Sequence, residues 1–425
     1  MLAIGAFLVV VFASSVRVIH HMNVPGDFNP QRWAMVDFRD AVYYPVVSFL
    51  NGGNPYDTER YLAAFPAGRH FPPYSPSTLL VHLPFGFIPH TASQLLYFGL
   101  TIVLTLVLAH LTLWMCERRP TVTSVFGLAT LILTTRLGHW NLMCGQTTLE
   151  LVLAVYIALY FGAKSTGVSG LAVVFATTKP TFGAPLIVLM LAHRHFRSVR
   201  LGIVLTVVAT LIPVAFLVHA SGGVPEFAAS LVRSYVGLGA ETTSNPVLSP
   251  YRIDLFALVC RLWGMSLGPV AEIIVFVAVM AAAGATILHV RKYARGRATD
   301  LYCISVASVA ILISSYQLSY NILLLVLPLT ALVLNRWVPR GFEVTPMVRL
   351  VLILLLSIPV FNFLGARRIM SHVEVGSGMW ILLTSVNGVA LLLAFGVYVV
   401  LAFRNPVIAN ITDEKASKVR LESEG

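Results

Sequence analysis

The feature that most constrains this chain is a series of long apolar runs, separated by polar segments, along almost its whole length. A helix needs about 20 mostly apolar residues to cross a bilayer, and such runs begin at residues 2–18 and recur up to residues 379–402. The composition agrees: 57% of the 425 residues are hydrophobic and 11% are charged, whereas soluble domains carry about 25% charged residues. We therefore expect an all-α polytopic membrane protein.

The runs predict about 10–12 transmembrane or re-entrant helices in a single domain, residues 1–404. Residues 2–18 are expected to form an uncleaved first span, because no basic segment precedes them. Further spans are predicted near residues 94–115, 121–136, 147–163, 201–218, 255–290 (one or two elements), 301–314, 321–335, 349–364 and 379–402. Lys179-Pro180 interrupts residues 167–192, which predicts a hairpin of half-helices meeting at Lys179. Residues 405–425 are expected to form a disordered cytoplasmic tail.

Basic residues fall mainly in the segments that a cytoplasmic N-terminus would leave inside, as the positive-inside rule requires. We therefore expect the protein to lie in the plasma membrane with both termini in the cytoplasm. The outer polar segments are then residues 20–75, 137–146, 219–254, 315–320 and 365–378, and the first of these should carry short helices. The net charge of +11 does not indicate nucleic-acid binding, because the basic residues form no continuous face.

Two acids follow the first span, Asp37 and Asp40. Ionisable groups next to membrane spans are costly and need a compensating role. Residues three apart share a helix face, and a carboxylate can accept a proton from a hydroxyl group as a general base. The two acids are candidate catalytic residues, although they could instead cap helices in a solvated loop. The sequence leaves open which of them would be the base.

Cations in the outer segments are candidates to bind a phosphate group. Lys179 lies inside an apolar hairpin, so it must snorkel, pair with an acid such as Glu150, or meet an anionic ligand. The half-helix that follows Pro180 would add partial positive charge toward a phosphate. Arg252 and Arg367 lie in later outer segments and are the next candidates.

Amide and hydroxyl side chains at the ends of spans are candidates to bind sugar hydroxyls. Gln146 lies where a span is predicted to begin, and Tyr316, Gln317 and Tyr320 lie between two later spans. The segment of Gln146 could equally be a helix cap with an interfacial tryptophan. The chain has neither a DxD motif nor a CxxC motif, so we predict no metal site and no cofactor.

Taken in order, these residues resemble the GT-C superfamily of polyprenyl-phosphate-sugar-dependent glycosyltransferases. The closest likeness is to glycosyltransferase family 87, which includes actinobacterial mannosyl- and arabinofuranosyltransferases. The resemblance rests on Asp37-Phe38, Gly52-Gly53-Asn54-Pro55-Tyr56-Asp57, Pro72-Pro73-Tyr74, Gly145-Gln146 and Lys179-Pro180. It implies a GT-C-like bundle with an extracytoplasmic active site. The implied catalytic base maps best to Asp37, with Asp40 as the alternative and Tyr44 among the aromatic residues that follow.

The resemblance also implies an activity. This is inverting transfer of a hexosyl, foremost mannosyl, or arabinofuranosyl unit from a polyprenyl-phosphate donor to a cell-envelope glycan or glycolipid. Many relatives carry a histidine in the segment that matches Tyr316 to Tyr320, and this chain does not. One of the two tyrosines could replace it, or His139 or Lys179 could face the phosphate. The alternative is a lipid or solute transporter or flippase, which would also contain broken helices.

Overall fold

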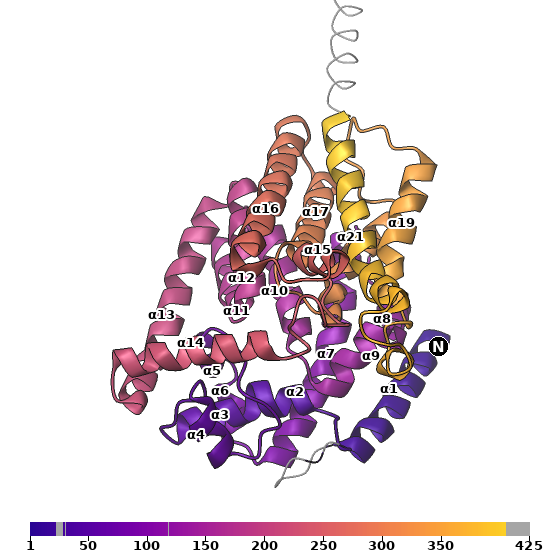
Figure 1. The fold of residues 1–425 in the computed structure, drawn as a ribbon. Helices are drawn as coiled ribbons and strands as arrows, with labels where there is room; N and C mark the ends of the chain where they lie inside the picture. Colours follow the sequence, from indigo (N-terminus) through magenta and orange to yellow (C-terminus); the bar gives the residue numbers. More distant parts are fainter. Residues whose placement is uncertain (23–28, 30, 118, 405–425) are drawn as a thin grey trace, which may run out of the picture.

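Long helices run side by side through most of the structure, and short helices cover one end of it (Figure 1). The computed structural model describes residues 1–22, 29, 31–117 and 119–404. These residues contain helices and two isolated bridges but no strand, so the predicted all-α class is confirmed. The predicted tail, residues 405–425, lies outside the described residues.

Among the described residues, six helices are long and apolar enough to cross a membrane. They are α1 (Leu2–His21), α7 (His90–Met115), α13 (Phe196–Ser221), α16 (Gly268–Tyr293), α17 (Arg297–Ser314) and α21 (Gly378–Arg404). Helix α17 is central, because every residue from Leu301 to Ser314 is buried. Helices α1 and α13 lie at the periphery and expose most of their apolar side chains. Exposed apolar surface of this extent fits contact with lipid.

Shorter apolar helices fill the space between the long ones. They are α8 (Val122–Thr134), α10 (Thr148–Phe161), α11 (Thr166–Thr177), α12 (Pro180–Ala192), the 3-10 helix η2 (Ser319–Leu325) with α18 (Val326–Val333), and α19 (Pro346–Phe361). Helices α11 and α12 are the predicted pair of half-helices, and Lys179 lies between them as the N-cap of α12. Pro180 occupies the first position of α12, where its missing N–H costs no hydrogen bond. The predicted segment 255–290 is two elements, α15 (Leu255–Trp263) and α16.

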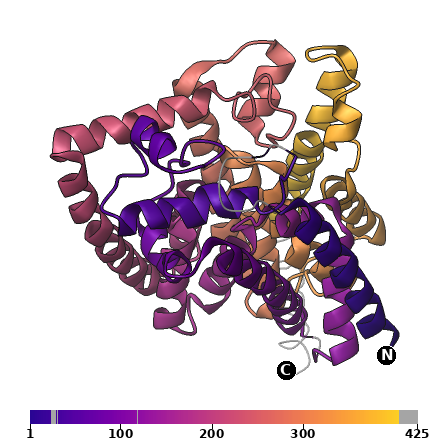
Figure 2. The ribbon, with the colours of Figure 1, turned by 90° about the horizontal axis from the view of Figure 1, so that it is seen from below.

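Two outer segments that the hydropathy pattern presents as loops contain helices. Residues 137–146 belong largely to α9 (Arg136–Cys144), which bends by 117° into α10. Thr135 caps α9, and Gly145 ends it at a φ of 67°, a value that glycine adopts without strain. Residues 219–254 contain the amphipathic helix α14 (Val224–Ala240), which crosses the lower face beside the short N-terminal helices (Figure 2). A hydropathy profile detects spans and misses short surface helices.

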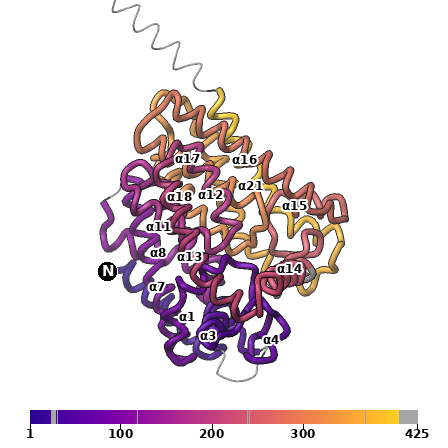
Figure 3. Tube along the Cα trace, turned by 90° about the vertical axis from the view of Figure 1, so that its left-hand side faces the viewer, coloured from indigo at the N-terminus to yellow at the C-terminus, as the bar shows by residue number. Residues whose placement is uncertain are grey.

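The first polar segment carries short helices, as predicted, and they gather at the lower end of the molecule (Figure 3). They are α2 (Val36–Phe38), the π-helix η1 (Arg39–Tyr43), α3 (Tyr44–Leu50) and α4 (Thr58–Ala64), followed by α5 (Ser77–Val81) and α6 (Leu83–Gly86). Asn54 fixes this cap to the bundle, because its amide donates to Ser221 and Ser230 at 2.9 Å. Tyr56 is fully buried and donates to the Tyr74 carbonyl at 2.6 Å.

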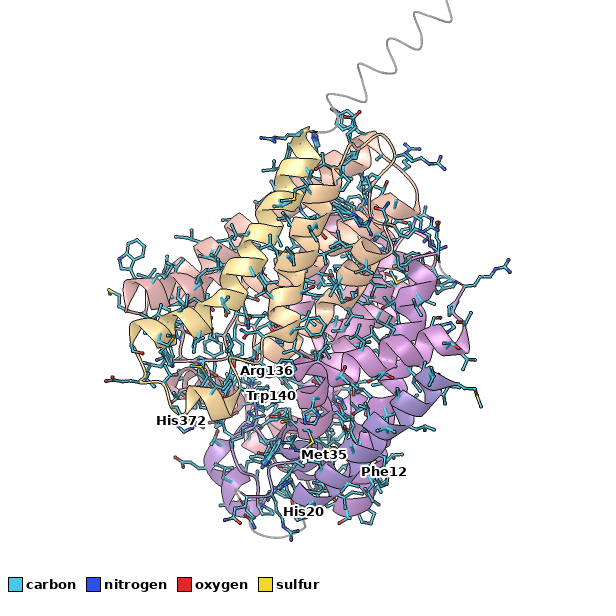
Figure 4. The ribbon with its side chains drawn as sticks, turned by 90° about the vertical axis from the view of Figure 1, so that its right-hand side faces the viewer. Phe12, His20, Met35, Arg136, Trp140 and His372 are labelled. Carbon is cyan, nitrogen blue, oxygen red and sulfur yellow. The ribbon has the colours of Figure 1, made fainter. Side chains whose placement is uncertain are left out.

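The opposite end of the bundle holds the starts of α17 and α19 and the ends of α16 and α21 (Figure 1). The basic segments that precede or follow these helices therefore share one end, as the loop charges predict. At the other end, Arg136 and Trp140 of α9 lie close together above Met35, and His372 lies nearby (Figure 4). The guanidinium carbon of Arg136 lies 5.3 Å from the centre of the Trp140 ring.

Candidate active site

Asp37 is held by the junction between the short helices and the bundle. It is the second residue of α2, whose N-cap Met35 has a left-handed backbone with a φ of 58°. The Met35 N–H donates to the carbonyl of Met143 in α9 at 2.7 Å, which fixes the start of α2 against the bundle. The side chain of Asp37 is 11% exposed. A π-helical turn follows immediately in η1, and such turns are frequent at functional sites.

The carboxylate of Asp37 accepts from two side chains that come from separate segments. Arg69, in the loop after α4, donates to Oδ1 of Asp37, and Gln146, between α9 and α10, donates to Oδ2. Charge-assisted hydrogen bonds of this kind are about twice as strong as neutral ones. The segment that carries Gln146 is therefore brought against the first polar segment.

Lys179 lies close enough to Asp37 and Arg69 to feel their charges, and it is 4% exposed. Its ammonium nitrogen lies 5.1 Å from the centre of the Tyr320 ring, 5.5 Å from Phe182 and 6.0 Å from Tyr74. The charges of Asp37 and Arg69 both act on it. No residue in the described part of the chain makes a hydrogen bond or ion pair with its ammonium group, so aromatic rings are its nearest partners.

We call Asp37, Arg69, Gln146, Lys179 and Tyr320 the Asp37 cluster. Its members come from five different segments of the chain. Tyr320 is the second residue of the 3-10 helix η2, and its carbonyl accepts from the amide of Asn141 in α9 at 3.2 Å. The cluster thus joins an acid, two cations, an amide and a phenol at the end of the bundle that the short helices cover.

Asp40 is completely buried behind Asp37. Its Oδ1 accepts from the Gly68 N–H at 3.1 Å and lies 4.0 Å from Nε of Arg39. Burial raises the pKa of Asp40 to about 6, although the charges of Arg69 and Arg39 oppose this rise. Tyr44 packs beside Arg39, with its ring centre 5.5 Å from the Arg39 guanidinium carbon. Asp40 and Tyr44 therefore support the loop that carries Arg69.

Arg252 is close to the predicted site residues but already has partners. Its Nε and Nη2 donate to Asp254 at 2.9 and 2.8 Å, Nη2 also reaches Glu272 at 3.2 Å, and Nη1 donates to the Ser244 carbonyl at 3.0 Å. Arg261 donates to the carbonyls of Arg252 and Thr384. We call Asp254, Arg252, Arg261 and Glu272 the Asp254 cluster. Its geometry favours a structural role for Arg252 over phosphate binding.

Two further candidates in the Tyr316–Tyr320 segment are also engaged. The Gln317 amide donates to the Thr181 carbonyl at 2.9 Å, and its oxygen accepts from Asn321 at 2.6 Å. Gln317 thus ties η2 to the start of α12. The Tyr316 hydroxyl lies 3.1 Å from the Ser244 hydroxyl, and its ring centre lies 5.0 Å from the guanidinium carbon of Arg252.

Of the two remaining phosphate candidates, only His139 can be placed relative to the Asp37 cluster, and it does not join that cluster. His139 lies in α9 with its Nε2 3.1 Å from Arg17 of α1. Arg367 begins the short helix α20 (Arg367–Met370), and its side chain lies outside what the structure describes. Glu150, the acid that the sequence offered as a partner for Lys179, instead contacts His82 at 3.1 Å and Tyr97 at 2.8 Å.

Sequence reasoning missed Arg69, which pairs directly with Asp37. Arg69 lies in an outer segment, where a basic residue breaks the positive-inside trend, and this was the available signal. The adjacent His70 lies 3.2 Å from Glu241, just after α14. This contact joins the loop of Arg69 to the surface helix that crosses the site.

Fold and site together define a multi-pass helical membrane protein with a polar, buried cluster at one end of its bundle. Comparison with family models finds glycosyltransferase family 87 over residues 71–315. This match covers more than half of the chain, so the chain belongs to glycosyltransferase family 87 and is a membrane glycosyltransferase. Within the Asp37 cluster, Gln146 and Lys179 lie inside the matched region, Asp37 and Arg69 precede it, and Tyr320 follows it. Comparisons with curated proteins and with solved structures give no match.

Proposed function

We propose that this glycosyltransferase moves a hexosyl, foremost mannosyl, or arabinofuranosyl unit from a polyprenyl-phosphate donor to a cell-envelope glycan or glycolipid. The observation that carries the proposal is the buried Lys179 ammonium, which makes no hydrogen bond or ion pair among the described residues although the charge of Asp37 acts on it. An acid that can accept a proton and a cation that can receive a phosphate are the two groups that this reaction needs.

Asp37 is the proposed base. An acceptor hydroxyl that displaces the Gln146 amide would reach Oδ2, while Arg69 keeps the carboxylate oriented through Oδ1. The hydroxyl proton passes to Asp37 as the acceptor oxygen forms a bond to the anomeric carbon. The bond from that carbon to the phosphate oxygen breaks, and its electron pair leaves with polyprenyl phosphate. Attack from the face opposite the phosphate inverts the anomeric configuration.

Lys179 and Arg69 are the proposed cations for the leaving phosphate, which gains negative charge as the bond breaks. Fixed charges in a site that excludes water stabilise such a transition state without reorganising. Lys179 lies at the N-terminus of α12, a 13-residue helix, whose partial positive charge acts in the same direction. Tyr320 and Gln146 are the proposed contacts to sugar hydroxyls.

We also propose that the Asp37 end of the bundle faces the outside of the plasma membrane and that both termini are cytoplasmic. The support is the basic residues at the opposite end, which the positive-inside rule places in the cytoplasm. The acidic and aromatic groups of the short helices would then meet lipid-linked sugars at the outer leaflet.

The direct test incubates the purified full-length protein in detergent with a panel of polyprenyl-phosphate sugars and a crude glycolipid extract as acceptor. Mass spectrometry should find one sugar added to an acceptor and an equal amount of free polyprenyl phosphate. Boiled protein and the Asp37→Asn variant serve as controls and should give neither product. If nucleotide sugars alone supported the transfer, the proposed donor class would be wrong.

A further inference from the structure

Two cavities begin at the end of the bundle that holds the basic segments, and the second extends from there to Leu137 of α9 and Ile322 of η2. The first has a volume of about 180 Å³ and is lined by polar residues that include Glu117, Arg297 and Arg336. The second has a volume of about 290 Å³ and an almost wholly apolar lining. The two adjoin at the end of α18, where Leu334 lines the apolar cavity and the next residue, Asn335, lines the polar one.

The polar cavity carries more positive than negative charge. Arg297 and Arg336 approach opposite oxygens of the Glu117 carboxylate at 4.0 and 3.8 Å. Both distances exceed those of hydrogen bonds, so the acid pairs only loosely with the two guanidinium groups. Nη2 of Arg297 also donates to the Trp114 carbonyl at 2.6 Å, so Arg336 is the more accessible of the two cations. The side chain of Arg336 is 51% exposed, which leaves its donors accessible to a ligand.

The start of α17 adds to this positive potential. Gly296 is the N-cap of α17 and has no side chain with which to cap the first turn, and Ala298 of that turn lines the cavity. The first N–H groups of an 18-residue helix carry partial positive charge. Asp300, the acid in the first turn, is already paired with Arg291 at 2.8 Å and Lys164 at 3.8 Å.

The apolar cavity is built by α7, α8, α18 and α19. It is open toward the lipid side of the bundle, because Leu131, Val333 and Phe361 line it and remain 49%, 54% and 42% exposed. From Leu334 beside the polar cavity, the lining continues to Leu137 and Ile322. A hydrocarbon chain in this cavity would therefore start beside the two arginines and run along the bundle.

We infer that these two cavities together bind one anionic phospholipid. Its phosphate contacts Arg336, Arg297 and the start of α17, and one of its acyl chains occupies the apolar cavity. Charge complementarity selects an anionic head group, and the adjoining apolar wall selects a lipid over free phosphate. The sugar donor is a different molecule in this arrangement, because its phosphate must reach Lys179 at the other end of the bundle.

Native mass spectrometry of the full-length protein, titrated with phosphatidylglycerol or phosphatidylcholine, tests the inference. The wild type should retain one phosphatidylglycerol at concentrations at which it retains no phosphatidylcholine. Arg336→Gln should weaken phosphatidylglycerol retention about tenfold, the loss expected for a charge-assisted contact. Arg340→Gln removes an exposed charge two positions from the polar-cavity residue Val338 without altering the cavity lining, and it should bind as the wild type does.

A second variant tests the apolar half. Leu329 lines the apolar cavity, and Leu329→Trp should fill it and lower phosphatidylglycerol retention, whereas inorganic phosphate should not compete in the wild type. Thermal unfolding without added lipid checks that each variant folds. Equal retention of both lipids, equal losses in Arg336→Gln and Arg340→Gln, or displacement by polyprenyl phosphate at the same concentration would each overturn the inference.

Discussion

Two buried clusters join carboxylates to cations in this molecule, and they differ in what they leave unpaired. In the Asp254 cluster, every guanidinium nitrogen of Arg252 donates to an acceptor. In the Asp37 cluster, Lys179 has aromatic neighbours and, within the described residues, no hydrogen bond or ion pair. A buried cation without an anion is costly, so the second arrangement is the one that gains from an anionic ligand.

This difference distinguishes a binding site from a structural network of the same residue types: the charged groups of a structural network already have partners. Asp254 also caps α15, because its carboxylate accepts from the Ala257 N–H at 3.0 Å. Substitutions in a saturated network should remove stability, because they leave partners buried without hydrogen bonds. Substitutions in the unsaturated cluster should remove activity and spare the fold.

The sharpest test of this comparison exchanges each acid for its amide. Asp37→Asn should lower the transfer rate about 10³-fold, the contribution of a general base. The unfolding temperature should change little, because the Arg69 side chain is 38% exposed and water can solvate its charge. Asp254→Asn should instead lower the unfolding temperature and the yield of folded protein. Transfer assays and thermal unfolding in the same detergent measure both. Near-normal transfer by folded Asp37→Asn would remove this acid from the mechanism.

The two cations provide the next test. Lys179→Met should lower transfer about 10²-fold, because the leaving phosphate loses a fixed charge, and it should fold normally, because no partner is left unpaired. Arg252→Met should cost about 3–5 kcal/mol of stability, since it leaves the Asp254 charge buried. Initial rates per folded protein separate the two outcomes. Equal destabilisation by both substitutions would mean that Lys179 is structural.

The sequence predicts the parts of the site that depend on one local pattern. A lysine followed by proline inside an apolar run predicts the half-helix hairpin at Lys179, and an acid beside a span predicts a role for Asp37. It does not predict Arg69, which approaches Asp37 only because the loop after α4 folds back over α2. Arg252 and Gln317 show a second limit of sequence-based prediction. Their residue types suggest contacts to a ligand, but only the fold shows that neighbouring residues already use their hydrogen-bonding groups.

The fold also has features that the sequence predicts and features that it does not. Apolar runs locate the spans, because a helix that crosses the hydrocarbon core must be long and mostly apolar. Helices α9 and α14 are missed, because one is too polar and the other too amphipathic to resemble a span. The bend of 117° between α9 and α10 depends on Gly145 and on packing against α2, and neither can be derived from hydropathy.

Asp40 gives a smaller effect that depends on pH. Its pKa of about 6 in the folded protein lies above the ordinary value of about 3.9 for an unfolded chain, so the folded state binds the extra proton between these values. Stability should therefore fall as pH rises from 4 to 6 and then level off. Between pH 5 and pH 7 the loss should be about 1 kcal/mol.

Asp40→Asn should abolish this part of the pH dependence, because the amide does not titrate. Unfolding temperatures at pH 5 and pH 7 should then differ less in the variant than in the wild type. Asp57→Asn, which removes a carboxylate that is 25% exposed and loosely paired with Arg60, is the matched control and should retain the wild-type difference. An unchanged pH dependence in Asp40→Asn would place the titrating group elsewhere.

The smallest expected effect concerns the two tyrosines that lie over the two cations. Tyr320→Phe keeps the ring that faces Lys179 at 5.1 Å and should lower transfer by less than about threefold, whereas Tyr320→Leu removes a cation–π contact and should lower it about tenfold. Tyr316→Leu removes the ring 5.0 Å from Arg252 but should leave transfer almost unchanged, because carboxylates already neutralise that arginine. The same assay on all three variants decides the matter. A larger loss in Tyr316→Leu than in Tyr320→Leu would mean that the functional cation is Arg252 and that the comparison between the two clusters must be reversed.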